Sequence, residues 1–307
     1  MQKQWNALQS PEVNHLLAQL NRCGYEAYLV GGAVRNAMLE LPIKDYDVAT
    51  SATPEQVTQA FERVIPTGIK HGTVTVLIGN ISIEVTTFRS EGTYSDGRRP
   101  DHVTFGTSIE QDLARRDFTI NAMAIDRDGR LIDPYGGAEA LKNRQLVAVG
   151  NAAKRLGEDR LRKLRAFRFV SQLGFTLCPQ LTESLGLDPT LNGVSGERIK
   201  SEMDKILMGA HAVQALQSMA EIGVMAIAMP ELQELVGYHQ GHPAHRYDAF
   251  NHTLSVLEAM PQALARMQLK EGEEPDLLLL KWAALYHDTG KPSTRTIDEE
   301  GISHYYD

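Results

Sequence analysis

Residues 28–35 read YLVGGAVR, and Asp45-Tyr46-Asp47 begin ten residues after the arginine that closes this stretch. Its first three residues predict a short buried strand. The two glycines after the strand allow backbone N–H groups to approach a phosphate closely, and Arg35 adds a fixed positive charge. Residues at i and i+2 on a strand point to the same face, so we expect the carboxylates of Asp45 and Asp47 side by side.

Paired carboxylates repel each other unless a cation lies between them, and an oxygen-only pair suits Mg²⁺ ions that also take substrate phosphates as ligands. Asp45 and Asp47 therefore predict a two-metal magnesium site. Each motif alone is typical of a turn, but together, in this order and spacing, they indicate a nucleotidyltransferase. Glu84 stands in the apolar strand pattern of residues 83–88. It either forms a structural ion pair or completes the acid cluster as a catalytic base, and both roles stay open.

The chain has 307 residues, which at roughly 100–200 residues per domain favours two or three domains. Strand and helix patterns are mixed up to about residue 135, and after Gly136-Gly137 we expect essentially only helical periodicity. The sequence thus predicts an α+β protein, with a mixed-sheet nucleotidyltransferase head followed by helices. The expected helices cover residues 11–24, 34–39, 109–112 and 118–124, with a further helix starting at 51–55; the expected strands cover 28–30, 46–49, 73–78, 81–88 and 103–105.

The composition, 42% hydrophobic and 23% charged, excludes a disordered or fibrous chain. No apolar run reaches the roughly 18 residues that cross a bilayer, and residues 1–10 lack the apolar core of a secretory signal. With two cysteines, the chain fits a reducing cytoplasm.

The net charge of −8 argues weakly against nucleic-acid binding, but residues 142–168 hold nine Lys or Arg and two acidic residues, a local charge of +7. This segment is a candidate phosphate-binding surface.

Further arginines could contact a nucleotide. Arg98-Arg99-Pro100 lie in a polar loop at residues 90–101, and Arg115-Arg116 precede the sequence DFTIN. Guanidinium groups of this kind could bind triphosphate or ribose oxygens.

Asp159 and Arg162 lie at i and i+3 of an expected helix, where an intrahelical salt bridge is one interpretation. In the other, the carboxylate accepts from the amino group of cytosine or adenine while the guanidinium donates to the neighbouring ring nitrogen. Uracil and guanine present the reverse pattern, so such a pair could select C and A without a nucleic-acid template.

Taken together, the motifs LVGGAVRN with KDYD, RRP, RRDFTINAMA and EDRLRKLRAFRF resemble the class II tRNA nucleotidyltransferases. This family contains the CCA-adding enzymes and, as close relatives, the bacterial poly(A) polymerases; the resemblance covers residues 28–208. It implies a head, a helical neck, body and tail, and two metal-binding aspartates at Asp45 and Asp47. It also implies phosphate- and base-binding roles for Gly32, Arg35, Arg116, Asp159 and Arg162, with Arg165 and Arg168 nearby. Asn36 departs from the family pattern, which usually has Asp there.

The resemblance implies template-independent transfer of CMP and AMP from CTP and ATP to the 3′ end of tRNA, in the cytoplasm and without a membrane partner. Residues 66–73, PTGIKHGT, are similar to the CCA-adding type, and the full-length loop at 90–101 favours addition of the terminal A. Enzymes that add only A or only CC, and poly(A) polymerases, stay open, and the oligomeric state is not indicated.

The C-terminal third carries a separate pattern. His252, and His287-Asp288 within AALYHDTGKP, resemble the HD phosphohydrolases, which implies a second divalent-metal site. The alternative is a pair of core or capping histidines. The chain ends within this pattern, so we expect the metal site to be incomplete. His239, His242 and His245 form a local cluster with no assigned role.

We expect three domains: a catalytic head at 1–140, a helical neck and body at 141–235 that binds nucleotide base and tRNA, and an incomplete HD-like region at 236–307. An HD-type phosphohydrolase is the alternative from a different class of function. A non-catalytic RNA-binding module is a third, which the paired carboxylates disfavour.

Overall fold

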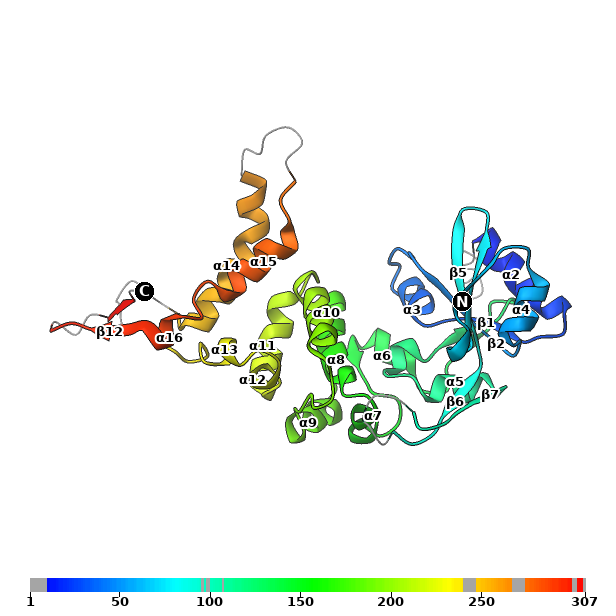
Figure 1. The fold of residues 1–307 in the computed structure, drawn as a ribbon, viewed down its shortest axis with the longest axis horizontal. Helices are drawn as coiled ribbons and strands as arrows, with labels where there is room; N and C mark the ends of the chain where they lie inside the picture. Colours follow the sequence, from blue (N-terminus) through cyan, green and yellow to red (C-terminus); the bar gives the residue numbers. More distant parts are fainter. Residues whose placement is uncertain are drawn as a thin grey trace. The chain divides into compact units, whose positions relative to one another are not determined.

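The computed structural model describes residues 10–94, 97, 100–106, 108–239, 247–266, 274–299 and 303–305. The chain forms two compact units (Figure 1). The first contains Met1–Asp159 and Thr176–Leu181, and the second contains Arg160–Phe175 and Thr182–Asp307. Over the described ranges, no helix combines the length and the apolar character needed to cross a membrane.

The first unit is built on a mixed sheet, in which seven strands can be followed within the described residues in the order β3-β4-β5-β2-β1-β8-β9. Neighbouring strands run antiparallel except β2 and β5, which run parallel. The strands are β1 (Ala27–Val30), β2 (Tyr46–Thr50), β3 (Val64–Gly68), β4 (Thr73–Ile78), β5 (Ile81–Thr87), β8 (Ala124–Ile125) and β9 (Leu131–Ile132).

Helices and short hairpins surround this sheet. The helices are α2 (Pro11–Arg22), α3 (Gly32–Met38), α4 (Pro54–Ala60), α5 (Ile109–Ala114), α6 (Gly137–Lys142) and α7 (Ala152–Glu158). Local sequence explains several of their starts: Thr53 and Gln56 form a reciprocal capping box before α4, as the sequence predicts. Phe88 and Leu113 belong to the buried cluster that joins α5 to the sheet.

The unit also holds short additional elements. These are the hairpin of β6 (Arg89–Glu91) and β7 (Val103–Phe105), the parallel pair of β10 (Gln145–Leu146) and β11 (Thr176–Leu177), and the 3₁₀ turns η1 (Ile69–His71) and η2 (Thr119–Asn121).

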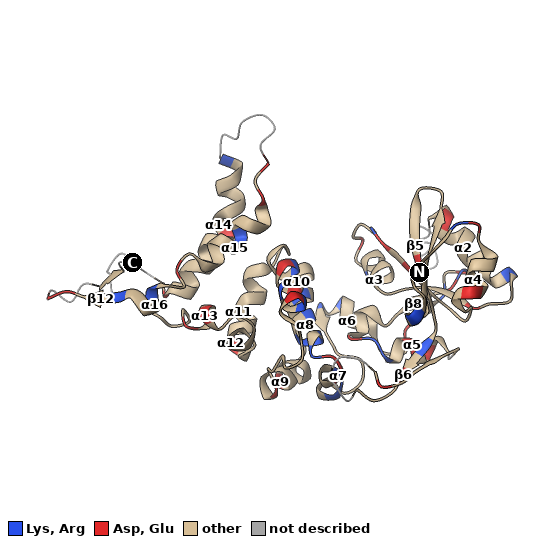
Figure 2. Ribbon diagram, viewed as in Figure 1, with Lys and Arg blue, Asp and Glu red and all other residues tan. Residues whose placement is uncertain are grey.

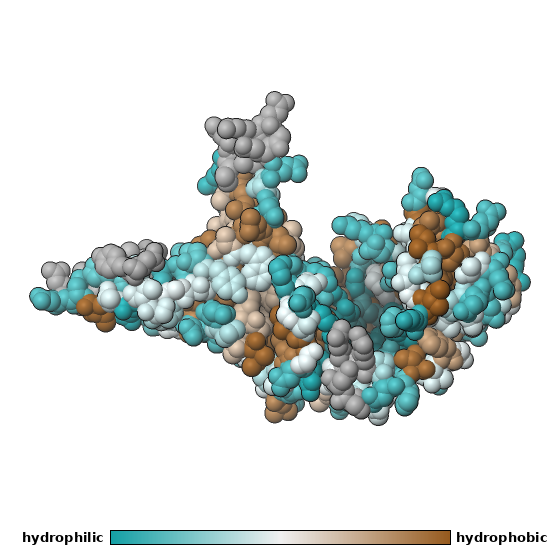
Figure 3. Space-filling model, in the orientation of Figure 1, coloured by the Kyte–Doolittle hydropathy of each residue, from teal (hydrophilic) through white to brown (hydrophobic). Residues whose placement is uncertain are grey.

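The second unit is mostly helical. Its elements are α8 (Leu161–Leu173), α10 (Gly196–Leu207), α11 (Ala212–Ile222), α12 (Met225–Ala228), α13 (Pro230–Gln233), α14 (Ala249–Arg266), α15 (Leu277–Tyr286), α16 (Lys291–Thr294) and the hairpin of β12 (Arg295–Ile297) and β13 (Ser303–Tyr305); α9 (Pro179–Leu187) begins in the first unit and continues into the second. Buried side chains from α8, α10 and α11, including Phe167, Ile206 and Leu216, form part of its core. Figure 3 shows hydrophobic surface on α14 and α15, where Leu279 is 64% exposed.

The α+β class is confirmed, and so are the strands expected at 73–78 and 103–105. The helix expected at 118–124 is wrong. That segment forms η2 and leads into β8, which pairs with β1. All residues of this segment are buried, so their burial does not alternate with a helical or a strand period. The hydrophobic pattern therefore cannot distinguish a helix from a strand there. The expectation of helices alone after residue 137 is also wrong, because β10 to β13 occur there.

Candidate active site

Asp47 occupies a fixed place in the sheet of the first unit. In the strand register it lies opposite Val30 of β1 on one side and opposite Glu84 of β5 on the other. Register partners point to the same face of a sheet, so Asp47 and Glu84 share a face. Glu84 is exposed, and Asp45 is exposed one residue before β2 begins. The structure therefore places Glu84 beside Asp47 on one face of the sheet, and Asp45 just before the strand that holds Asp47.

The charges around Asp47 show that these groups interact. Burial raises the pKa of Asp47, the negative charges of Glu84 and Asp45 raise it further, and Arg116 opposes them. A carboxyl with a raised pKa among other carboxylates is one that a bound cation would hold in its ionised form. The oxygen donors at this position fit a divalent metal, and Asp45 and Asp47 are the residues that would hold it.

The turn between β1 and α3 depends on glycine. Gly31 has φ = 68° and ψ = −130°, a backbone conformation that side chains strongly disfavour. A Cβ atom at Gly31 would also lie 3.0 Å from Nη1 of Arg116 and 3.5 Å from Oδ2 of Asp47. Glycine is thus required both for the turn and for the close approach of Arg116 and Asp47 to the backbone.

Arg35 of α3 is held by two asparagines. Its Nη1 donates to Oδ1 of Asn121 at 2.6 Å, and its Nε and Nη2 donate to Oδ1 of Asn36 at 3.1 and 2.8 Å. The amide of Asn36 supplies the acceptor that an aspartate would offer, and its Nδ2 donates to the carbonyl of Pro42. Asn36 thus makes a backbone bond that the acceptor-only aspartate could not make.

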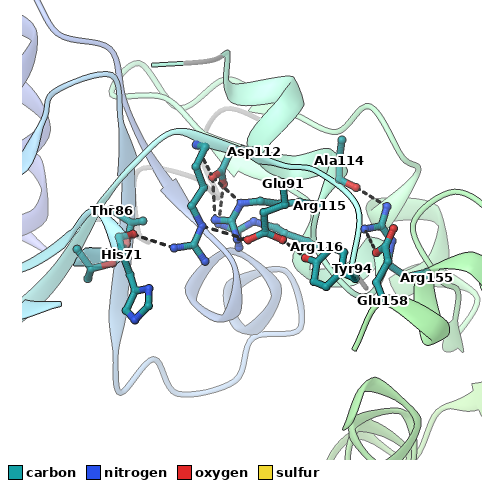
Figure 4. A network of polar contacts seen from close by, with 12 residues as sticks. His71, Thr86, Glu91, Tyr94, Asp112, Ala114, Arg115, Arg116, Arg155 and Glu158 are labelled. Atoms are coloured by element: carbon teal, nitrogen blue, oxygen red, sulfur yellow. Dashed lines mark hydrogen bonds and ion pairs between the residues drawn. The ribbon is translucent and has the colours of Figure 1, made fainter. Parts of the chain in front are cut away.

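A network of acids and arginines lies beside the site (Figure 4). Asp112, with 1% of its side chain exposed, forms ion pairs with Arg115 at 2.8 Å and with Arg116 at 3.3 Å. Burial raises the pKa of Asp112, but Arg115 and Arg116 outweigh it and hold that pKa below its ordinary value. Arg115 also pairs with Glu91 at 3.1 Å, and Glu91 pairs with Arg89.

This network changes the interpretation of the Arg115-Arg116 motif. Two carboxylates hold Arg115, whereas Arg116 donates to the carbonyl of Asn121 and is the one that approaches Gly31. Sequence reasoning missed Asp112 and Glu91. The i+3 and i+4 spacings from Asp112 to the two arginines could have indicated the first, but nothing local indicates Glu91, 24 residues from Arg115. Arg98 and Arg99 lie outside the described residues.

The residues predicted to read the base lie where α7 ends and α8 begins. Asp159 follows α7 with φ = −135° and ψ = 107°, so its backbone is extended, and α8 starts only at Leu161. The expectation that Asp159 and Arg162 are i,i+3 neighbours on one helix is therefore wrong. Asp159 ends one segment of the first unit, and Arg162, 8% exposed, belongs to the second unit.

The two remaining arginines of α8 pack against Phe169. The guanidinium of Arg165 lies 5.8 Å from the centre of that ring, and that of Arg168 lies 4.7 Å from it. Arg168 also pairs with Glu202 of α10 at 3.1 Å. Figure 2 shows the basic residues of α8 beside the acidic residues of α10. Arg168 thus contributes to the packing of α8 on α10.

A cluster of side chains that could hold a metal ion lies in the second unit. His252 of α14, His287 at the end of α15, and Asp288 place one ligand atom each within 4.8 Å of one another. Nε2 of His287 lies 3.4 Å from Oδ2 of Asp288, and that of His252 lies 3.9 Å from it. Lys291 pairs with the same oxygen at 2.8 Å. His239 is exposed, and His242 and His245 lie outside the described residues.

A strand, a glycine turn and a helix, with carboxylates on the next strand and its parallel neighbour, define a nucleotidyltransferase head. Family models agree: "Poly A polymerase head domain" matches residues 27–147, "Probable RNA and SrmB- binding site of polymerase A" matches 174–235, and "HD domain" matches 249–306.

Relatives with known names point the same way. The chain is 48% identical over 233 residues to the CCA-adding enzyme of Geobacillus thermodenitrificans strain NG80-2, covering 76% of this chain and 57% of the relative. It is 50% identical over 212 residues to that of Geobacillus stearothermophilus, covering 69% and 52%. The chain thus spans about half the length of these curated relatives.

Solved structures extend the comparison. The CCA-adding enzyme of Bacillus stearothermophilus in complex with CTP matches with a TM-score of 0.66 and 36% identity, over 92% of this chain and 79% of that one. A tRNA nucleotidyltransferase complexed with a primer tRNA and an incoming ATP analog has a TM-score of 0.67 at 24% identity, over 89% and 75%, and shares the fold. The chain belongs to the family of class II tRNA nucleotidyltransferases and poly(A) polymerases.

Proposed function

We propose that the chain adds C and A nucleotides from CTP and ATP to the 3′ end of tRNA without a nucleic-acid template. The observation that carries this proposal is the position of Asp47 between Val30 and Glu84, with Gly31 and Arg116 beside it. The CTP complex of a relative that is 36% identical supports the nucleotide, and the name CCA-adding enzyme among relatives supports the product.

Each residue at the site has a proposed part in the reaction. Asp45 and Asp47 would hold Mg²⁺, and the bound metal would supply activation of the attacking 3′-hydroxyl and neutralisation of charge on the leaving pyrophosphate. Glu84, on the same face as Asp47, is the residue we propose to accept the proton of that hydroxyl. Gly32, Arg35 and Arg116 contact the triphosphate. Asp159 and Arg162 read the edge of the base, and Arg165 and Arg168 lie with Arg162 on α8, where they pack against Phe169.

The proposal also includes a division of the chain into three domains. We place the catalytic head at residues 1–140, the neck and body at 141–235, and the HD-like region at 236–307. The family models at 27–147, 174–235 and 249–306 support three functional parts. A cytoplasmic location follows from tRNA as the substrate.

Nucleotide incorporation on three tRNA substrates tests this function. The tRNAs end before the first C, after one C, or after CC, and each is incubated with one of the four nucleoside triphosphates and Mg²⁺. We expect CTP to extend the first two and ATP to extend the third, with little use of UTP or GTP. ATP use on the CC substrate alone indicates an A-adding enzyme, CTP use alone indicates a CC-adding enzyme, and repeated A addition indicates a poly(A) polymerase. If none of the four nucleotides is incorporated on any of the three tRNAs, the proposal is overturned.

A second candidate function rests on the cluster of His252, His287 and Asp288. These groups could hold a divalent metal for an HD-type phosphohydrolase. Lys291 already neutralises Asp288, which disfavours a metal there. Release of inorganic phosphate from phosphate esters in the presence of divalent cations, with no nucleotide incorporation, would favour this function over the first.

A further inference from the structure

Arg155 of α7 connects three segments of the first unit through one side chain. Its Nη1 pairs with Glu158 at 2.7 Å, its Nη2 donates to the carbonyl of Ala114 at 2.7 Å, and its Nε donates to the carbonyl of Val149 at 3.2 Å. Figure 4 shows this guanidinium between Ala114 and Glu158. The planar fork of arginine fixes the relative directions of its acceptors in a way that the single ammonium of lysine does not.

Both ends of this connection lead to residues proposed to touch the nucleotide. Ala114 is the last residue of α5, and its carbonyl lies one peptide unit from Arg115 and two residues from Arg116. Asp112 of the same helix pairs with Arg116, so an ion pair joins the end of α5 to that guanidinium. At the other end, Glu158 is the last residue of α7 and directly precedes Asp159.

We infer that Arg155 is a positioning residue that fixes the carboxylate of Asp159 relative to the guanidinium of Arg116. This inference rests on the proposed function, because it takes Asp159 to contact the base and Arg116 to contact the triphosphate. In a nucleotide, the base and the triphosphate are joined through one ribose, so the distance between them varies little. A protein that reads the base without a template therefore needs its base-reading and phosphate-binding groups at a fixed spacing.

Arg155 and Glu158 lie at the wall of a cavity rather than in the closed core. Its side chain is 15% exposed and that of Glu158 is 14% exposed. Both residues line a cavity of about 740 Å³, together with Gln111 and Ala114. Water can therefore reach the groups that a substitution leaves without a partner, which limits the cost to folding.

The test compares base choice in three variants of the full chain: Arg155→Met, Glu158→Gln and the double variant. The readout is the ratio of kcat/KM for CTP to kcat/KM for UTP on tRNA ending before the first C, with thermal unfolding measured in parallel. We expect each single variant to lower this ratio by about tenfold, within the range that a bidentate base contact provides. The double variant should lower it no further than the stronger single variant, because both substitutions break the same connection.

Arg127→Met is the matched control, since Arg127 lies in the turn between β8 and β9, is half exposed and pairs with its neighbour Asp128. It should keep the wild-type ratio. A structural role for Arg155 predicts lower thermal stability with an unchanged CTP/UTP ratio, and that result overturns the inference. If Arg155→Met does not fold, an unchanged ratio in Glu158→Gln overturns it equally. If the wild-type chain incorporates no nucleotide, the proposed function itself fails, which is a distinguishable outcome.

Discussion

Asp47 on β2 and Glu84 on β5 are direct partners in the parallel register at the centre of the head sheet. Two acids placed opposite each other on one face repel, and Asp47 responds with a raised pKa, owing first to burial and then to Glu84. Such an arrangement destabilises the free protein locally. It becomes favourable when a cation is bound, which is why we place the metal at Asp47 and Asp45.

Replacing Asp47 or Asp45 by alanine should abolish nucleotide addition while the fold remains. Each substitution removes an oxygen ligand, and metal stabilisation of the transition state contributes several kcal/mol, so kcat should fall at least about a hundredfold. Single-turnover incorporation of CTP across a Mg²⁺ titration measures this. Asp128→Ala, at a carboxylate that is 83% exposed, is the control. Wild-type turnover of either variant at saturating Mg²⁺ would show that the metal assignment is wrong.

Gly31→Ala should lower both stability and activity. The positive φ of Gly31 makes a side chain strained by about 1–3 kcal/mol, and the new methyl group would lie only 3.0 Å from Nη1 of Arg116. Gly136→Ala separates the two effects, because Gly136 also has a positive φ but a Cβ there meets nothing within 4 Å. Urea unfolding should show a loss for both variants, larger for Gly31→Ala because its ψ of −130° lies outside the left-handed α region that Gly136 occupies with ψ = 32°. CTP incorporation should fall strongly for Gly31→Ala alone. Equal activities would contradict a role for Gly31 at the site.

Asp159→Ala should change the preference for C over U more than it changes the rate of the chemical step. The carboxylate that accepts from the amino group of C or A is lost, so UTP should gain relative to CTP by one to two powers of ten, or about 1–3 kcal/mol. Arg162→Ala should instead weaken CTP and ATP together. The kcat/KM ratio for CTP and UTP measures the difference. An unchanged ratio in Asp159→Ala would eliminate base reading by this residue.

His287→Ala should leave C and A addition unchanged, because His252, His287 and Asp288 belong to the second unit and the proposed catalytic carboxylates belong to the first. Incorporation of CTP and ATP on the three tRNA substrates checks this, with divalent-metal binding measured by calorimetry on the same variant. A loss of incorporation in a folded His287→Ala protein would show that the two functions are divided incorrectly.

Asp188 and the buried Lys163 of α8 should make part of the stability depend on pH. Hydrogen bonds from Thr190 hold the pKa of Asp188 down to about 2 against the opposing effect of burial, and Lys163, 2.9 Å away, lowers it further. A depressed carboxyl pKa stabilises the fold fully above the ordinary value of 3.8, and this contribution disappears as the pH falls towards 2.

Asp188→Asn should therefore cost about 0.5–1 kcal/mol at pH 7, a modest value because Asp188 is half exposed and its charge is screened. The difference between wild type and variant should shrink between pH 4 and pH 2. Urea unfolding at several pH values measures it. A difference that stays constant over that interval would mean that the charge of Asp188 does not contribute.

The sequence by itself determined the elements whose signals are local. The strand and glycine turn at residues 28–32, the capping residues before α4 and the strand at β4 follow from short-range sterics and hydrogen bonding, which a few neighbouring residues fix. The same local order, a glycine turn followed by the Asp45–Asp47 pair, was enough to indicate a nucleotidyltransferase head.

Only the tertiary structure decided the rest, because it depends on contacts between residues far apart in the chain. The register that places Glu84 opposite Asp47 joins strands separated by more than 30 residues, and no local pattern encodes it. The pairing of Arg115 with Glu91 and the burial of residues 118–125, which lead into β8, have the same origin. Asp159 has an extended backbone although EDRLR has good helical spacing, and it lies at the point where the chain passes from the first compact unit to the second.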